Sequence, residues 1–406
     1  MPELKILFLQ MLVILAVAKA AGLLFRLIHQ PEVLGEMLAG ILLGPSLLGR
    51  VAPRLMEELF APASLGPLYA LSQVGLVLFM FLVGLEVHPG LLRQSAKSAI
   101  LAGQASLAAP VVCGAILASV LYARLGAGAP RLPFVLFFGA AMGITAFPVL
   151  ARILAECKLS NTRVGIIALS CAAANDVGAW CLLAIITVAT RPEAAHWPLT
   201  LRFAALGAYM LIMVGAVRPV LRRIFPPDVP LGPDRFAVAV FLLLGSVWAS
   251  EVLAVHALFG AFLAGVVMPR NPLLESSLKE RVELVTLVLL LPLFFVYNGL
   301  RTSIGLINGL DLWFICILII AVAVASKLAI TAVCLRAGGL PWRESLAVGA
   351  LVNARGLVEL VILNVGLDLR IISPTLFSMM VIMALTTTFM TPPLVSWIHP
   401  DPHPHA

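Results

Sequence analysis

The sequence predicts an all-α integral membrane protein. Hydrophobic residues fill 61% of its 406 positions and charged residues only 12%, whereas a soluble domain carries about 25% charged residues. The apolar residues fall in runs of about 20, the length with which an α-helix crosses ~30 Å of hydrocarbon. Because lipid offers the backbone no hydrogen-bond partner, each run is expected to be a helix that satisfies its own N–H and C=O groups. A soluble globular protein is thereby excluded.

The apolar runs number about thirteen. We expect a single transmembrane domain over residues 1–400 and a short cytoplasmic tail at 401–406. The first run resembles a secretory signal, but its length and Lys19, just before the small-residue pattern that would be cleaved, favour a retained helix. The expected spans are 5–25, 33–48, 67–86, 98–121, 133–155, 163–189, 200–221, 235–250, 254–268, 283–300, 312–335, 344–366 and 372–397.

The basic residues indicate orientation and not nucleic-acid binding. The formal charge is +7, but most Lys and Arg lie in the short connections between runs, and one set of alternate connections carries the excess. By the positive-inside rule that side is cytoplasmic, so the N-terminus is expected outside and the C-terminus inside a bacterial-type inner (plasma) membrane. The six cysteines lack the paired spacing of a metal site or a disulfide framework, and no cofactor is predicted.

Two of the predicted spans are interrupted, and they match each other in layout. The span at 133–155 is broken at 143–148, around Thr145 and Pro148, and Asp176 follows Thr145 by 31 residues. The span at 344–366 is broken at 353–356, and a threonine run, 386–388, follows at the same distance. Seven spans separate the two copies, and this odd offset inverts the second copy in the membrane. Although single proline kinks are common in transmembrane helices, paired interruptions in an inverted repeat indicate a secondary transporter's binding site.

Charged residues inside spans are the second indication of function, because each costs about 2.5 to 3.5 kcal/mol at the bilayer centre. Asp176 lies near the middle of its span, and the preceding Asn175 offers an amide oxygen that suits a hard cation. Lys327 is similarly isolated, and Asp176 is its expected partner. This pair is interpreted as functional, with a structural ion pair between two helices as the alternative.

Arg355 and Glu359 are four residues apart and therefore share a helix face. We interpret them as a structural pair that positions the second interrupted helix, together with Asn353 and Gly356. Pro148 supports the first interruption in the same way.

Five segments also resemble a known family. The segments QPEVLGEMLAGILLGPSLLG (30–49) and GLVLFMFLVGLE (75–86) resemble signatures of the monovalent cation:proton antiporters, which include Kef-type potassium efflux systems and plant cation/proton exchangers. The plant branch is the closer match for TAFPVLARIL (145–154), NDVGAW (175–180) and NARGLVEL (353–360). The resemblance covers nearly the whole chain but includes no Kef-type nucleotide-binding regulatory domain.

The resemblance implies the Na⁺/H⁺ exchanger fold, with two crossed discontinuous helices in a core domain, a dimerisation domain and a homodimer. It implies that Asp176 binds the cation, Na⁺ or K⁺, and the proton, with Thr145 and Asn175 close by and Lys327 facing it. A soluble regulatory subunit is left open as a partner. The chain departs from the family in two respects. Many electrogenic relatives carry two adjacent Asp residues where this chain has Asn175-Asp176, a form that resembles electroneutral exchangers. Electroneutral exchangers commonly have Arg and a nearby Glu in the site, whereas this chain has Lys327 and Cys171.

The predicted function is exchange of Na⁺ or K⁺ for H⁺ by competition at Asp176, in a membrane domain that opens alternately to the two sides. The alternatives are a Kef-like potassium efflux channel or transporter and a non-transporting membrane sensor. An intramembrane enzyme is not expected, because the chain contains neither a His-Glu-x-x-His motif nor a Gly-x-Ser-x-Gly motif.

Overall fold

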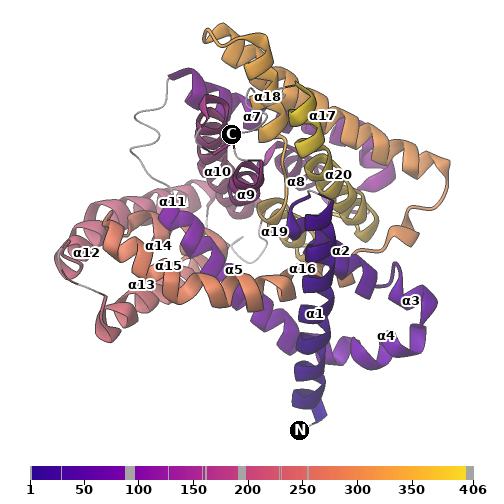
Figure 1. The fold of residues 1–406 in the computed structure, drawn as a ribbon, viewed down its shortest axis with the longest axis horizontal. Coiled ribbons are helices and arrows are strands. Elements are labelled where there is room, and N and C mark those ends of the chain that lie inside the picture. The colour runs from indigo at the N-terminus through magenta and orange to yellow at the C-terminus, as the bar shows by residue number, and fades with distance from the viewer. Residues whose placement is uncertain are drawn as a thin grey trace. The chain divides into compact units, whose positions relative to one another are not determined.

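The computed structural model describes residues 2–28, 30–86, 97–126, 128–157, 159–160, 162–190, 198–227, 229, 231–253 and 256–398. Within these ranges the protein is helical and contains no strand (Figure 1). The predicted tail, 401–406, lies outside the described residues. The helices are α1 (Pro2–Leu27), α2 (Glu32–Leu43), α3 (Leu48–Val51), α4 (Pro53–Leu59), α5 (Leu65–Glu86), α7 (Lys97–Leu125), α8 (Arg131–Gly143), α9 (Phe147–Glu156), α10 (Arg163–Thr190), α11 (Leu199–Ile212), α12 (Arg218–Ile224), α13 (Pro233–Val252), α14 (Ala257–Val267), α15 (Pro272–Val285), α16 (Leu291–Leu300), α17 (Leu310–Ala337), α18 (Trp342–Val352), α19 (Leu357–Asp368) and α20 (Pro374–Ile398).

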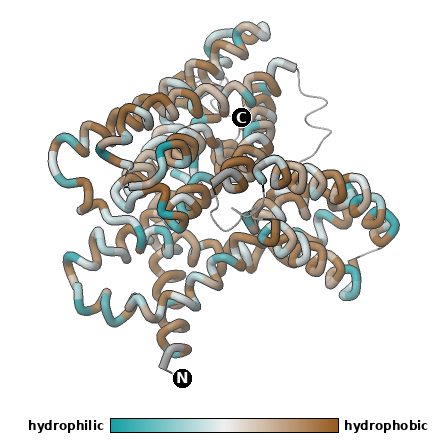
Figure 2. The backbone as a smooth tube through the Cα atoms, turned by 180° about the vertical axis from the view of Figure 1, so that it is seen from behind, coloured by the Kyte–Doolittle hydropathy of each residue, from teal (hydrophilic) through white to brown (hydrophobic). Residues whose placement is uncertain are grey.

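Ten helical stretches in the described residues are long and apolar enough to cross a membrane. Each overlaps one of the predicted spans. The other three predicted spans correspond to the interrupted pairs α8–α9 and α18–α19 and to the short helix α14. In Figure 2 hydrophobic residues run along the helices, and hydrophilic residues gather mainly towards helix ends and connections. The prediction of an all-α, multi-pass membrane protein is therefore confirmed.

Prolines mark the starts of many helices. Five of the described α-helices begin at a proline, namely Pro2, Pro53, Pro233, Pro272 and Pro374. The first helical turn tolerates proline because its N–H groups have no intrahelical partner, and the fixed φ of proline already suits the helix. Two π-helical turns, Met213–Val217 and Thr286–Leu290, join α11 to α12 and α15 to α16 without a break in the helix.

The chain forms two compact units. Unit 1 comprises Met1–Leu15, Leu59–His88 and Ala184–Tyr297, and unit 2 comprises Ala16–Glu58, Pro89–Leu183 and Asn298–Ala406. Each is described by itself.

In unit 1, α14 packs against α5 and α13 (Figure 1). The close approach of α5 and α14 depends on glycine, because a Cβ at Gly84 would collide with the α14 backbone and one at Gly265 with the α5 backbone. Arg270 donates hydrogen bonds to the carbonyl oxygens of Leu85 (2.5 Å) and Val266 (3.1 Å), and so caps the ends of both helices. Burial lowers the pKa of Arg270, and the nearby Glu275 carboxylate opposes that effect.

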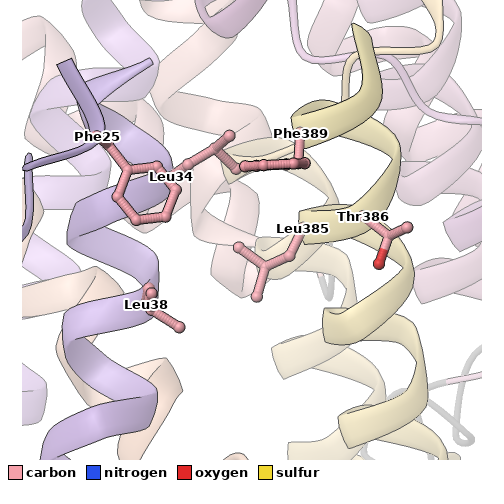
Figure 3. A pocket seen from close by; sticks show the side chains of 6 residues that line it. All are labelled: Phe25, Leu34, Leu38, Leu385, Thr386 and Phe389. Atoms are coloured by element: carbon pink, nitrogen blue, oxygen red, sulfur yellow. The ribbon is translucent and has the colours of Figure 1, made fainter. Parts of the chain in front are cut away.

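In unit 2, α7 packs against α8 and α17, and α18 packs against α17 and α20. An apolar groove of about 230 Å³ lies beside α20, lined by Phe25, Leu34, Leu38, Leu385, Thr386 and Phe389 (Figure 3). Thr386 faces this groove, whereas the next two residues, Thr387 and Thr388, are buried. One helix thus presents its threonines both to an apolar groove and to the polar interior described below.

Candidate functional site

Two interrupted helices meet inside unit 2. Helix α8 ends at Gly143 and α9 begins at Phe147, while α18 ends at Val352 and α19 begins at Leu357. The two gaps are joined directly, because the Ala146 N–H donates to the Ala354 carbonyl oxygen (3.2 Å) and the Thr145 hydroxyl donates to the Val352 carbonyl oxygen (2.9 Å). The interruptions lie where the sequence predicts them, and they form one polar centre.

Side chains from the neighbouring helices complete each interruption. The Thr145 N–H donates to Asn175 Oδ1 on α10 (3.0 Å). In the second interruption the Arg355 N–H donates to Thr388 Oγ1 on α20 (2.8 Å), and the same hydroxyl donates to the Arg355 carbonyl oxygen (2.7 Å). A buried backbone group without a partner costs about 1 to 3 kcal/mol. These polar residues therefore stabilise a backbone that would otherwise be unsuited to an apolar interior.

The carboxyl end of α8 is neutralised by cationic groups. Arg355 donates through Nη1 to the Ala141 carbonyl oxygen (2.9 Å) and through Nη2 to that of Met142 (2.5 Å). Lys327, from α17, donates to the Gly143 carbonyl oxygen (2.8 Å). The last carbonyls of a helix carry partial negative charge, so cations are favourable there. The carboxyl end of α8 thus accepts hydrogen bonds from two basic side chains.

The Asn175 side chain, on α10, also binds the first interruption. Its Nδ2 group donates to Ser106 Oγ on α7 (3.0 Å) and to the Gly143 carbonyl oxygen (3.3 Å). With the bond from Thr145, its amide joins α7, α8 and α10. Asn175 therefore has a structural role in addition to its predicted role as a cation ligand. The role as a ligand stays a prediction.

Asp176 is 1% exposed and immediately follows Asn175 on α10. The Lys327 ammonium is attracted electrostatically by Asp176 and Glu359 and repelled by Arg355. Lys327 thus lies within the electrostatic influence of Asp176 and donates its hydrogen bond to Gly143. The functional pairing of Lys327 with Asp176 stays a prediction.

The remaining predicted residues lie at the second interruption or in α9. Arg355 Nη1 is 3.7 Å from Glu359 Oε1, and both side chains are fully buried. Asn353 caps the end of α18 and is buried. A Cβ at Gly356 would approach Val149 Cγ2 to 2.9 Å, so the glycine allows α9 and the second interruption to lie close together. Pro148 lies in α9, and its side chain is outside the described part of the structure.

Two participants carry no specific signal in the sequence. Ser106 is a small hydroxyl residue in a long apolar helix, a pattern that also fits ordinary helix packing. Thr388 belongs to the threonine run 386–388 noted in the sequence, but its bonds to the Arg355 backbone were not predicted. The Gly143 carbonyl oxygen, which accepts from both Lys327 and Asn175, is a backbone group. In the described ranges no three His, Cys, Asp or Glu side chains gather as they do around a transition metal. An alkali cation does not require such a cluster, since one carboxylate and neutral oxygens suit it.

Comparison with known proteins decides the family. The family model described as "Sodium/hydrogen exchanger, transmembrane" matches residues 12–398. The chain belongs to this family. The predicted resemblance to cation:proton antiporters is thereby confirmed. Because sodium/hydrogen exchangers are secondary transporters, the prediction that the chain is not an enzyme is confirmed as well.

Relatives within the exchanger family come from bacteria, plants and yeast. The Na(+)/H(+) antiporter NhaS4 of Synechocystis is 42% identical, and the alignment covers 96% of each chain. Cation/H(+) antiporter 17 of Arabidopsis thaliana is 39% identical and K(+)/H(+) antiporter 1 of Saccharomyces cerevisiae is 33% identical, each over 97% of this chain. This chain spans about half the length of these two relatives, 48% and 46%.

A solved structure shows the same fold. The sodium proton antiporter MjNhaP1 from Methanocaldococcus jannaschii matches with a TM-score of 0.67 over 97% of both chains, at 14% sequence identity. At that identity the likeness establishes the exchanger fold alone.

Proposed function

We propose that this protein is a secondary-active antiporter that exchanges Na⁺ or K⁺ for H⁺ by competition at Asp176. Relatives named as Na⁺/H⁺ and K⁺/H⁺ antiporters support the reaction class. The observation that carries the proposal is the position of Asp176. It is a buried carboxylate one residue after the asparagine that holds an interrupted helix.

Competition follows from the chemistry of a single carboxylate. A bound proton neutralises the oxygens with which a hard cation would be coordinated, so the two ligands exclude each other. Each adds one positive charge to the site. Lys327 and Arg355 compensate the carboxylate when no ligand is bound, which lowers the cost of a buried charge. Alternating access then converts competition into exchange, since the site faces one side at a time.

Transport in everted vesicles tests the proposal. Cation-dependent proton movement is expected to collapse in Asp176→Ala and Asp176→Asn, because neither side chain can exchange a proton for a cation. Asp368→Asn is the matched control, since it removes a carboxylate that is 44% exposed and paired with Arg301 at 2.6 Å. Retained exchange in folded Asp176 variants would refute the assignment.

The same vesicle assay distinguishes the proposed antiporter from the two alternative functions. A Kef-like efflux channel would pass cations down their gradient without proton movement. A non-transporting sensor would move neither ion in the wild-type protein. Comparing Na⁺, K⁺ and Li⁺, with the membrane potential clamped or free, also reports the preferred cation and the charge moved in each cycle.

The proposal includes the placement and assembly of the protein. The chain crosses a bacterial-type inner (plasma) membrane about thirteen times, with the N-terminus outside and the C-terminus in the cytoplasm. The interrupted pairs α8–α9 and α18–α19 cross within a core domain that moves against a dimerisation domain in a homodimer. A soluble regulatory subunit is an optional partner. The direct bonds between the two interruptions support the crossing of these pairs.

A further inference from the structure

The interior of unit 2 contains a balanced set of charges. Among the described residues, the charged side chains that are buried are Asp176, Lys327, Arg355 and Glu359, each at most 1% exposed. Their formal charges cancel when both carboxylates are ionised and both basic groups are protonated. Balance matters here, because an uncompensated charge is costly in a water-free interior. Three of the four have tasks in the site described above, and Glu359 is the exception.

Glu359 is not needed as a hydrogen-bond acceptor. Its nearest cationic atom is Arg355 Nη1, at 3.7 Å, which is an ion-pair distance and longer than a hydrogen bond. Among the described residues neither carboxyl oxygen accepts a hydrogen bond. Arg355 is anchored independently, because two of its nitrogens bind the α8 carbonyls. The contribution of Glu359 is therefore its charge.

That charge acts on the groups around Asp176. Glu359 lies in the first turn of α19, which packs against α8 and α20. Helix α20 carries no titratable side chain, and α8 carries only Arg131, at its opposite end. Besides Arg355, the charged group that faces Glu359 is Lys327, which Asp176 also attracts. The two carboxylates thus share one buried ammonium.

We propose that Glu359 is a positioning residue whose negative charge, when its carboxyl group is ionised, raises the proton and cation affinity of Asp176, and so helps to set the pH range of exchange. The inference rests on the proposed function, because it requires Asp176 to be the exchanging group.

The sign of the effect follows from the charge balance. With Glu359 ionised, the empty site is neutral and a bound H⁺ or Na⁺ brings it to +1. Without that charge the empty site is already +1, and either ligand would bring it to +2. Asp176 would then bind protons less readily, so a more acidic medium would be needed to load it. Cations would also bind more weakly.

Exchange by purified protein in proteoliposomes, measured from pH 5.5 to 9, tests this. Glu359→Gln, which keeps the shape of the side chain, is expected to move the pH of half-maximal exchange about one unit towards acid. The KM for the cation, measured at the alkaline end where protons compete least, should rise about tenfold. A purely structural role would lower the amount of folded protein or the maximal rate and leave the pH profile in place.

Two controls accompany the variant. Glu359→Asp keeps the charge and should keep the wild-type profile. Glu344→Gln removes a carboxylate on α18 whose partner, Arg163, is 65% exposed in its side chain, and should shift nothing. An unmoved profile and KM in folded Glu359→Gln, with normal wild-type exchange, would overturn this inference and leave the proposed function standing. Absence of exchange in the wild-type protein would instead defeat the proposed function.

A second neutral variant covers the case in which Glu359→Gln does not fold. Glu359→Met removes the same charge and leaves no amide without a partner in the interior. Its pH profile should show the same shift towards acid, and an unmoved profile in the folded variant would contradict the proposal.

Discussion

The Asn175 amide makes three hydrogen bonds in the interior of unit 2. Its oxygen accepts from the Thr145 N–H, and its nitrogen donates to Ser106 and to the Gly143 carbonyl. The isolated Asn-Asp pair in an apolar helix was sufficient to predict a polar site. The family resemblance implied that Thr145 lies nearby. Ser106 and the Gly143 carbonyl oxygen were not predictable, because they lie 69 and 32 positions away in the chain and depend on how the helices pack.

Replacing Asn175 by alanine is expected to lower thermal stability clearly. The Thr145 N–H would stay buried without a partner, which costs about 1 to 3 kcal/mol. The Gly143 carbonyl oxygen keeps its bond from Lys327, and the Ser106 hydroxyl keeps its bond to the Gly103 carbonyl oxygen. Unfolding in detergent, followed by the loss of a monodisperse peak on heating, measures the effect. The control is Asn308→Ala, at an exposed position, where a change within about 0.5 kcal/mol is expected. Equal melting temperatures of the two variants would show that the Asn175 hydrogen bonds contribute little to stability.

At the scale of elements, both interruptions were predictable because glycine, proline and asparagine disturb an apolar run visibly. The binding of Lys327 and Arg355 to the carboxyl end of α8 was not predictable. Lys327 was expected to pair with a carboxylate, and its hydrogen bond goes to the carboxyl end of α8. Helix ends attract cations through partial charges that no side chain in the sequence represents.

Gly356 provides a test of the close packing between the interrupted helices. Gly356→Ala would place a Cβ 2.9 Å from Val149 Cγ2, so α9 or α19 must shift, and overpacking of this kind costs about 1 to 3 kcal/mol. Lower thermal stability and several-fold slower exchange are expected. Adding Val149→Ala should restore both, whereas Gly207→Ala, where a Cβ meets nothing within 4 Å, should be harmless. Failure of the second substitution to rescue would locate the damage elsewhere.

For the whole molecule, composition determined the class, since 61% hydrophobic residues leave few alternatives to a membrane bundle. The bounds of individual spans were harder to predict from composition. The run predicted at 283–300 belongs to a longer helical stretch, Pro272–Leu306, because the charged first turns of α15 hide its helical continuity from a hydropathy count. The division into two units has no signature in composition, as both are built from similar apolar helices.

The proposed topology predicts the side on which each terminus lies. Green fluorescent protein fused after Ala406 should fluoresce in bacterial cells, because it folds in the cytoplasm, and alkaline phosphatase at the same place should be inactive. An odd number of spans together with the positive-inside rule gives this expectation. The reverse pattern of reporter signals would require an even number of spans or an inverted protein.

The bonds around α8 have a mechanical consequence. Its carboxyl end is tied to α10 through Asn175, to α17 through Lys327 and to the junction before α19 through Arg355. None of these helices can slide past α8 without giving up a hydrogen bond in a place where water cannot replace it. These hydrogen bonds couple the helices, so displacement of one helix is expected to carry the others along, together with any ion that the proposed site holds.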